Sequence, residues 1–278
     1  MSTASVLIPA DDTAQAISGT PAPRYTLLLS TEPEHIEAAQ RLRHEVFTSE
    51  PGFALTASPD GLDADRFDQY CDHLLVREDG SGELVGCYRM LPPPGAIAAG
   101  SLYTATEFDV RSLDDLRPSL VEMGRAVVRA DHRNGAVVLL MWAGILAYLD
   151  RCGYDYVTGC VSVPTHPAGE TPGSGLRGVR DFVLRRHGAP AEYTVRPYRP
   201  VVIDGRGLDD IEPPARVNVP ALMRGYLRLG AQVCGEPAHD PDFGVGDFPA
   251  LLGKRNADVR YLKRLRSVSQ ATEGEARP

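Results

Sequence analysis

An apolar strand pattern, a polar turn and a long apolar helix follow one another in the middle of the chain, and this order limits the fold more than any other feature. The run 120–128 is typical of a strand. A helical pattern follows over 135–151, and Gly153 comes where a left-handed residue often ends a helix. Its most apolar part, 136–149, has about 14 residues, fewer than the ~18 of a membrane span. We therefore expect a buried helix packed on a sheet.

Shorter strand and helix patterns lie on both sides of this unit. Strand patterns cover residues 25–29, 73–76, 84–91, 120–128 and 156–161, and helix patterns cover 33–47, 135–151, 176–187 and 217–229. The turn EDGSG at 78–82 predicts that the strands before and after it form a hairpin. The order of the elements indicates an α/β fold with a mixed sheet flanked by helices, in one domain.

Composition divides the chain into three parts. Residues 1–23 are small and polar, so we expect a disordered N-terminal arm. Residues 24–250 form the predicted domain, and 251–278 form a basic C-terminal segment and tail. The start MSTASVLIPADDTAQ has no basic region before its apolar run, so no secretory signal is expected. We predict a cytoplasmic protein that can touch the inner face of the membrane.

Charge and cysteine content argue against several classes of protein. The net charge of -8 argues against a general affinity for nucleic acid, which requires a basic surface. The five cysteines contain no C-x-x-C pair, so we expect neither a disulfide framework nor a metal site. No cysteine lies in a Cys–His setting typical of a thiol nucleophile.

The turn before the long helix has a composition suited to phosphate binding. A helix N-terminus presents unpaired N–H groups and a partial positive charge. His132, Arg133 and Gly135 lie in this turn. Strand-to-helix turns with Arg and Gly are also common as structural features, so the residues alone leave both interpretations open.

Several charged residues fall inside predicted ordered segments. They are Arg43, Asp63, Asp65, Asp68, Arg89, Glu122 and Arg125. Charges are costly to bury without partners. The set is consistent either with structural ion pairs or with a polar pocket for a charged small molecule. We predict that Asp65, Asp68 and Arg89 form one cluster with Arg43.

Four blocks in order resemble the acyl-homoserine-lactone synthases and their relatives. These blocks are RHEVF at 43–47, D-x-x-D at 65–68, G-C-Y-R at 86–89 and E-x-x-R at 122–125. Further blocks resemble the sister family of ornithine lipid synthases, namely 68–76, 108–110, 122–128, 139–149 and 220–248. The last block is absent from the shorter lactone synthases. The resemblance covers roughly residues 25–265.

This resemblance implies a GCN5-like N-acyltransferase fold with a mixed, mostly antiparallel sheet. It implies transfer of a 3-hydroxyacyl chain from acyl carrier protein, or from CoA, to the α-amine of ornithine or a similar amino acid. The product would be a lyso-ornithine lipid, and no tightly bound cofactor is expected beyond the acyl-phosphopantetheine thioester. Two alternatives stay open: a lactone-synthase-like enzyme that uses S-adenosylmethionine, and a carrier-binding module without catalysis.

The resemblance also implies roles for individual residues. Glu122 is either the general base for the amine or an ion-pair partner of Arg43 or Arg125. Backbone N–H groups near 127–129 would bind the oxyanion. Substrate-binding roles are implied for Arg43, Phe47, Asp65, Asp68, Arg89 and Arg125. Contact with the donor is implied for Val127, Arg129, His132, Arg133 and Gly135.

The segment 254–266 is the densest basic stretch of the chain. It carries six Lys or Arg and one Asp, with apolar residues at helical spacing. Three interpretations remain open: a solvated tail, a docking surface for acyl carrier protein, and a patch for anionic lipid head groups.

Overall fold

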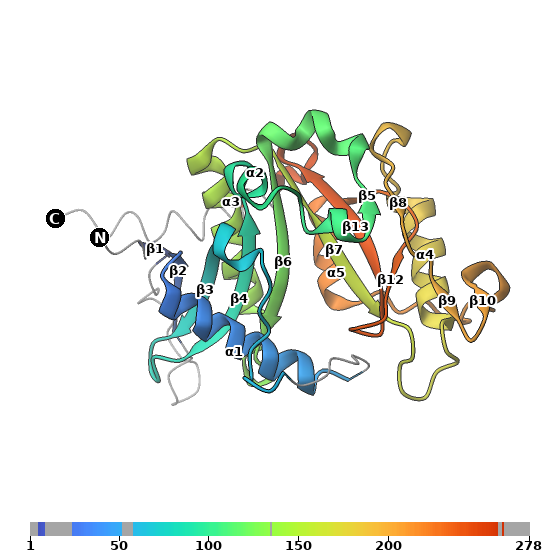
Figure 1. Cartoon of the computed structure of the whole chain (residues 1–278), viewed down its shortest axis with the longest axis horizontal. Coiled ribbons are helices and arrows are strands. Elements are labelled where there is room, and N and C mark those ends of the chain that lie inside the picture. The colour runs from blue at the N-terminus through green and yellow to red at the C-terminus, as the bar shows by residue number, and fades with distance from the viewer. Residues whose placement is uncertain (1–4, 9–23, 52–57, 134, 261–262, 264–278) are drawn as a thin grey trace.

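The computed structural model describes residues 5–8, 24–51, 58–133, 135–260 and 263. Its centre is a nine-stranded sheet with the order β1-β2-β3-β4-β6-β7-β13-β11, and β12 also pairs with β13 (Figure 1). The strands are β1 Ser5–Ile8, β2 Tyr25–Ser30, β3 Asp72–Glu78, β4 Leu84–Leu91, β6 Leu120–Val128, β7 Tyr156–Pro164, β11 Gln232–Val233, β12 Ala238–Asp240 and β13 Val245–Gly253. Two small pairs join β5 Phe108–Asp109 to β8 Arg196–Pro197 and β9 Val202–Ile203 to β10 Arg206–Gly207.

Helices cover both faces of this sheet. They are α1 Pro33–Ser49, α2 Pro93–Ala99, α3 Ala136–Cys152, α4 Ser174–His187 and α5 Ala221–Leu229. In Figure 1, α1 crosses in front of the sheet, whereas α3 and α5 lie behind it. Helix α3 starts after Gly135 and ends before Gly153, and both glycines have left-handed backbones, with φ of 84° and 74°.

The two faces of the sheet bury different cores because side chains alternate along a strand. Leu27 and Leu74 belong to the larger core, which contains α3, α4 and α5. Their neighbours Leu28 and Leu75 point the other way and pack with Val46 of α1. The polar residues discussed below lie on this second, α1-facing side.

Strand β6 contains a β-bulge that decides which of its side chains share a face. Between the register pairs 87↔127 and 89↔124, one residue of β4 faces two residues of β6. Arg125 lies in this bulge with a left-handed φ of 54°. In a regular strand Glu122 and Arg125 would point to opposite faces. The extra residue instead lets both side chains reach one cavity on the α1-facing side.

Strands β6 and β7 form the parallel pair of the sheet, and their pairing is short. It covers 120–122 against 156–158, whereas β7 pairs with β13 along all nine residues 156–164. Just beyond this pairing, a Cβ on Gly159 would lie 2.2 Å from the carbonyl oxygen of Met123. Only glycine fits there, so the two strands touch at this point before β6 leaves towards the turn and α3.

The sequence patterns predicted most of these elements, and three differences have physical causes. Residues 5–8 form β1 against β2, so the prediction of a disordered arm over 1–23 is wrong for these four residues. The prolines at 92–94 begin α2 rather than only ending a hairpin, because Pro suits a first helical turn. Strand β13 was not predicted, since Asp247 and Pro249 interrupt its apolar pattern.

Among the described residues, no helix is long and apolar enough to cross a membrane. Of the thirteen residues of the basic segment 254–266, the structure describes eight, 254–260 and 263. Within the described part, Lys254 is already engaged, because its Nζ lies 2.7 Å from Asp150 Oδ1.

Candidate active site

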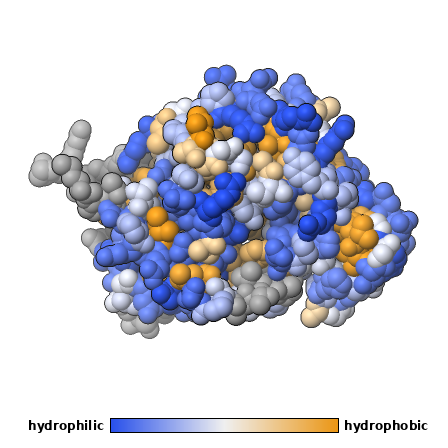
Figure 2. Space-filling model, viewed as in Figure 1, coloured by the Kyte–Doolittle hydropathy of each residue, from blue (hydrophilic) through white to orange (hydrophobic). Residues whose placement is uncertain are grey.

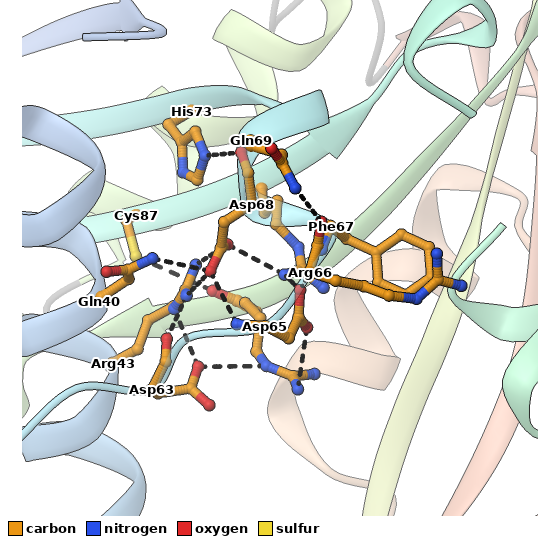
Figure 3. A network of polar contacts seen from close by, with 12 residues as sticks. Gln40, Arg43, Asp63, Asp65, Arg66, Phe67, Asp68, Gln69, His73 and Cys87 are labelled. Atoms are coloured by element: carbon orange, nitrogen blue, oxygen red, sulfur yellow. Dashed lines mark hydrogen bonds and ion pairs between the residues drawn. The ribbon is translucent and has the colours of Figure 1, made fainter. Parts of the chain in front are cut away.

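A buried network of three arginines and three aspartates lies on the α1-facing side of the sheet (Figure 3). Arg43 of α1 donates two parallel hydrogen bonds to Asp68, at 3.0 Å from Nη1 and 2.9 Å from Nη2. Its Nη2 also donates to the backbone carbonyl of Asp63. Its Nε lies 2.9 Å from Asp63 Oδ2 without forming a hydrogen bond. Arg43 is only 1% exposed, so it is a structural cation that holds the loop before β3.

Two further arginines extend this network across the strands. Arg89 of β4 contacts Asp65 at 2.6 Å and Asp68 at 3.0 Å. Arg125 of β6 contacts Asp63 at 3.2 Å and Asp65 at 3.5 Å. The predicted cluster is confirmed, with Asp63 and Arg125 as further members. Three guanidinium groups meet three carboxylates, so the network is balanced in charge.

The aspartate at the centre of the network stays ionised. Burial alone would raise the pKa of Asp68, but hydrogen bonds and attraction from Arg43, together with attraction from Arg89, hold it far below its usual value. The neighbouring His73 donates from Nε2 to the backbone carbonyl of Asp68 at 3.0 Å, and burial lowers the pKa of this histidine. The network therefore fixes the loop 63–68, and its arginines offset the negative charges of its aspartates. We call this loop with its ion pairs the frame.

A cavity opens beside this frame, where β4, β6, β7, β12 and β13 present their α1-facing side chains. Its lining includes Phe47, Arg89, Glu122, Arg125, Phe243 and Asp247. Phe47 of α1 and Phe243 meet edge to face, with ring centroids 5.5 Å apart. The surrounding surface is mostly hydrophilic, with apolar residues in small separate patches (Figure 2). The cavity thus combines aromatic walls with charged groups of both signs.

Arg125 is the cation of the network that is best placed to meet a ligand. Its guanidinium lies 4.9 Å from the ring centroid of Tyr103 and 5.2 Å from that of Phe243. Arg125 lines the cavity, whereas Arg43 is buried and is not part of the cavity lining.

Glu122 does not take the ion-pair role that was one of its two predicted functions. Its Oε2 accepts a hydrogen bond from the Tyr103 N–H, and its Oε1 accepts from the N–H and the hydroxyl of Thr104. No ion pair with Arg43 or Arg125 is formed within the described structure, because these arginines bind the aspartates. Burial raises the pKa of Glu122 against these hydrogen bonds, and the carboxylate lines the cavity. The base role stays a prediction.

The turn between β6 and α3 holds its charged side chains in internal contacts. His132 contacts the Tyr25 hydroxyl at 2.9 Å and the Arg129 guanidinium at 3.0 Å. Arg129 is paired with Glu83 at 2.7 Å, and Arg133 with Glu50 at 2.6 Å.

The predicted oxyanion donors over 127–129 require a correction at Arg129. The N–H of Arg129 donates to the carbonyl of Val85 at 2.8 Å, so it is not available to a ligand. Val127 lies opposite Cys87 in the ladder, beyond the bulge. Backbone irregularity near the cavity occurs instead at Arg125.

A second set of acidic groups lies at the cavity and was not predicted from the sequence. We call Glu107, Asp240 and Asp247 the acidic trio; their carboxylate oxygens lie within 4.8 Å of one another. Asp240 and Asp247 line the cavity, and Asp247 is only 5% exposed. Asp240 and Asp247 lie in the block 220–248, which the sequence analysis noted. They are far from Glu107 in sequence, so the three could not be grouped without the fold.

The trio holds like charges in a confined space. Burial, followed by repulsion from Asp247 and Asp240, raises the pKa of Glu107 well above its usual range, against the attraction of Arg125. Burial and repulsion from Asp240 also raise the pKa of Asp247. A free trio therefore binds protons near neutral pH, or it binds a cation in their place.

Protonation of the trio predicts a pH-dependent stability. The folded-state pKa of Glu107, about 9, exceeds the ordinary 4.5, so the unfolding free energy should fall as pH rises between these values. Urea unfolding at pH 5 to 8.5 should give Glu107→Gln a shallower fall than the wild type. The difference should approach one proton, about 1.4 kcal/mol per pH unit at its steepest. Exposed Glu192→Gln is the control. Equal slopes for Glu107→Gln and wild type would contradict a raised pKa.

The cysteines offer no activated thiol. Burial raises the pKa of Cys71, Cys87 and Cys234 to about 12. Cys160 lines the cavity, but burial, Glu107 and Asp247 raise its pKa well above 9.0. These groups stay protonated near neutral pH, which argues against a covalent thiol intermediate.

Known proteins match this chain in sequence and fold. A family model described as an acetyltransferase (GNAT) domain matches residues 42–143. An L-ornithine N(alpha)-acyltransferase of Brucella abortus (strain 2308) is 34% identical over 239 residues, which cover 82% of this chain and 83% of that protein. One of Rhizobium meliloti (strain 1021) is 32% identical over 254 residues, covering 84% and 81%.

A solved CoA-dependent acyl-homoserine lactone synthase is 17% identical, covers 86% of this chain and 83% of its own, and has a TM-score of 0.48. The GNAT match and the mixed, mostly antiparallel sheet confirm the predicted fold class.

Proposed function

Because this chain belongs to the family of L-ornithine N(alpha)-acyltransferases and is an N-acyltransferase, we propose that it joins an acyl chain from a thioester to the α-amine of ornithine. The observation that carries this proposal is the cavity in which the bulged strand β6 presents Glu122 and Arg125 together. A carboxylate can take the proton of an amine, and a guanidinium can bind the carboxylate of an amino acid.

In the proposed reaction the α-amine loses a proton and attacks the thioester carbonyl. Glu122 is the proposed acceptor of that proton, directly or through a water molecule. A C–N bond forms, the C–S bond breaks, and the leaving thiolate is protonated. Arg125 is the proposed partner of the acceptor's α-carboxylate. Arg43, Asp65, Asp68 and Arg89 would fix the frame around it, with Phe47 as one wall.

A second cavity is the proposed place of the acyl chain. It shares Met123 and Cys160 with the first and is lined by Tyr88, Trp142 and Tyr226. This second cavity lies within the larger core, to which Tyr88, Met123 and Trp142 belong. We place the acyl chain here, since burial of a hydrocarbon chain against apolar side chains is favourable.

The donor is proposed to be an acyl-phosphopantetheine thioester, carried by acyl carrier protein or by CoA. Its phosphate would lie at the turn where β6 leads into α3, near the left-handed Gly135. Arg133 is the cation of this turn with the most exposed side chain, 43%, and its present partner Glu50 is 30% exposed. A phosphate could replace that partner. The basic segment 254–266 stays a candidate for docking the acidic carrier or a membrane surface.

Removal of the Arg133 side chain should weaken donor binding selectively. A charge-assisted hydrogen bond of about 1.5–3 kcal/mol predicts that Arg133→Ala raises the KM for the donor roughly 10- to 100-fold. The KM for the amino acid should stay unchanged. Arg117→Ala is a matched control, because Arg117 is 38% exposed and paired with Asp114 on a different element. Steady-state kinetics with each substrate varied would contradict the placement if both arginine variants gave equal donor KM values.

Product analysis tests the function itself. The purified full chain would be incubated with 3-hydroxyacyl carrier protein and a panel of amines that includes ornithine, lysine and S-adenosylmethionine. Mass spectrometry should find an N-acylornithine, which is a lyso-ornithine lipid. An acyl-homoserine lactone as the main product, or no product from any amine, would contradict the proposal.

A further inference from the structure

Around the cavity, the arginines of the network have acidic partners, whereas a group of carboxylates has no basic partner among the described residues. Among the described residues, the three arginines of the network are paired with three aspartates at 2.6–3.5 Å. No described Lys, Arg or His forms an ion pair within 4.0 Å with Glu107, Asp240 or Asp247. The acidic trio therefore lies at the cavity without a cation of its own, although it faces the neutralised network.

Hydrogen bonds within the protein satisfy only part of the trio. Asp247 Oδ1 accepts from the Ser162 hydroxyl at 2.6 Å. Asp240 Oδ1 accepts from the backbone N–H groups of 242–243 at 2.9 and 3.1 Å. Glu107 Oε2 is enclosed and accepts no hydrogen bond from any described residue. A buried carboxylate oxygen without a donor is unfavourable unless a proton or a ligand satisfies it.

Two members of the trio, Asp240 and Asp247, line the same cavity as Glu122. Thr104, which binds Glu122, is followed three residues later by Glu107, and the Glu107 N–H donates to the Thr104 carbonyl at 3.1 Å.

We infer that the acidic trio binds the side-chain ammonium of the acceptor amino acid, while the α-amine lies at Glu122. This inference rests on the proposed function, and it assigns residues to the recognition of a diamino acid. A cation placed among the three carboxylates would offset their mutual repulsion and donate to the unsatisfied Glu107 oxygen.

The placement also explains which amine would react. An ammonium held between carboxylates keeps its proton, because the negative charges favour its charged form. It then has no lone pair and cannot attack the thioester. The α-amine, at the other end of the ligand, is the one that can lose its proton.

Acceptor selectivity tests the inference. Norvaline has the carbon chain of ornithine without the side-chain amine. Wild-type kcat/KM should favour ornithine over norvaline by on the order of 10²-fold or more, because polar groups built for a partner reject an analogue that lacks it. Asp247→Asn should reduce this preference to below about 10-fold through loss of ornithine activity, with norvaline activity unchanged or raised. Glu107→Gln is the second variant.

A matched control changes the same charge nearby. Asp242 is exposed and lies in the turn beside Asp240. Asp242→Asn should leave the preference for ornithine intact. Equal loss of activity towards both acceptors in Asp247→Asn and Glu107→Gln would show a structural role and overturn the inference. A preference for ornithine that is unchanged in both variants would also overturn the inference. The same holds if EDTA abolishes activity and Mg²⁺ or Ca²⁺ restores it, because a divalent cation would then occupy the trio.

A binding measurement separates this inference from the proposed function. Calorimetric titration of each amino acid into the protein needs no turnover. Ornithine should bind at least about 10-fold more tightly than norvaline, and Asp247→Asn should remove the difference. Wild-type acylation of both acceptors with equal efficiency would overturn the inference and leave the N-acyltransferase function standing. Tight, selective binding of ornithine without acylation would contradict the function and leave the trio's role intact.

Discussion

Arg89→Ala is expected to lower the free energy of unfolding by about 3–5 kcal/mol, because it removes one partner from a buried charge network. Arg89 is only 4% exposed and contacts Asp65 at 2.6 Å and Asp68 at 3.0 Å. After the change, Asp68 keeps Arg43, whereas Asp65 keeps the Phe67 N–H at 2.8 Å and the longer ion pair with Arg125 at 3.5 Å. Urea unfolding at pH 7, followed by circular dichroism, measures this effect.

The matched control is an exposed pair on α1. Arg41 and Glu37 are 2.6 Å apart with side chains 59% and 55% exposed. Arg41→Ala should cost only about 0.3–0.5 kcal/mol, as for solvent-exposed helix pairs. A cost below about 1 kcal/mol for Arg89→Ala would mean that the network does not stabilise the frame. Activity has to be measured at a temperature where the variant is folded, since unfolding would mimic a loss of catalysis.

Glu122→Gln is expected to lower turnover by on the order of 10²–10⁴-fold, because the amide cannot accept the proton of the amine. Part of the change will be structural. Glu122 accepts from the N–H groups of Tyr103 and Thr104, and a Gln NH₂ group would meet one of these donors. We therefore also expect a loss of stability of about 1–3 kcal/mol, with the fold retained.

The pH dependence of turnover and one control variant separate a catalytic role of Glu122 from a role in holding the loop at Tyr103 and Thr104. A base must be deprotonated, so wild-type kcat/KM should fall as pH falls through the raised pKa of Glu122, and Glu122→Gln should lack this limb. Thr104→Val removes the hydroxyl donor and keeps the carboxylate. Its turnover should stay within about 10-fold of wild type, since the carboxylate and its two backbone N–H donors are kept. An equal fall in both variants would indicate that Glu122 only holds the loop.

The sequence predicted the elements whose signal is local. Helix α3 combines an apolar pattern with a glycine before and after it, and its observed bounds differ from the predicted ones by one residue at each end. The network was predictable because charges in apolar segments need partners, and it contains the Asp65, Asp68, Arg89 and Arg43 cluster that was expected.

The geometry of the E-x-x-R block could not be predicted in the same way. Regular alternation along β6 places Glu122 and Arg125 on opposite faces. The bulge, with Arg125 at a φ of 54°, brings both to the cavity. No glycine or turn residue at position 125 announces a left-handed backbone, so this feature depends on tertiary contacts.

The acidic trio depends on pairings between distant parts of the chain. Asp247 belongs to β13, which contains Pro249 and was not predicted as a strand. The Pro249 carbonyl accepts the Cys234 N–H at 2.8 Å, although proline offers the ladder no N–H of its own. Only the register of β13 against β7 and β12 brings Asp247 to Ser162 and next to Asp240.

The position of the acyl group on ornithine tests the account most directly. Ornithine labelled with ¹⁵N at the α-nitrogen would be incubated with the full chain and a 3-hydroxyacyl carrier protein, and the product would be examined by ¹⁵N–¹³C correlation NMR. An amide on the labelled α-nitrogen is the predicted result. An amide on the unlabelled side-chain nitrogen would contradict it.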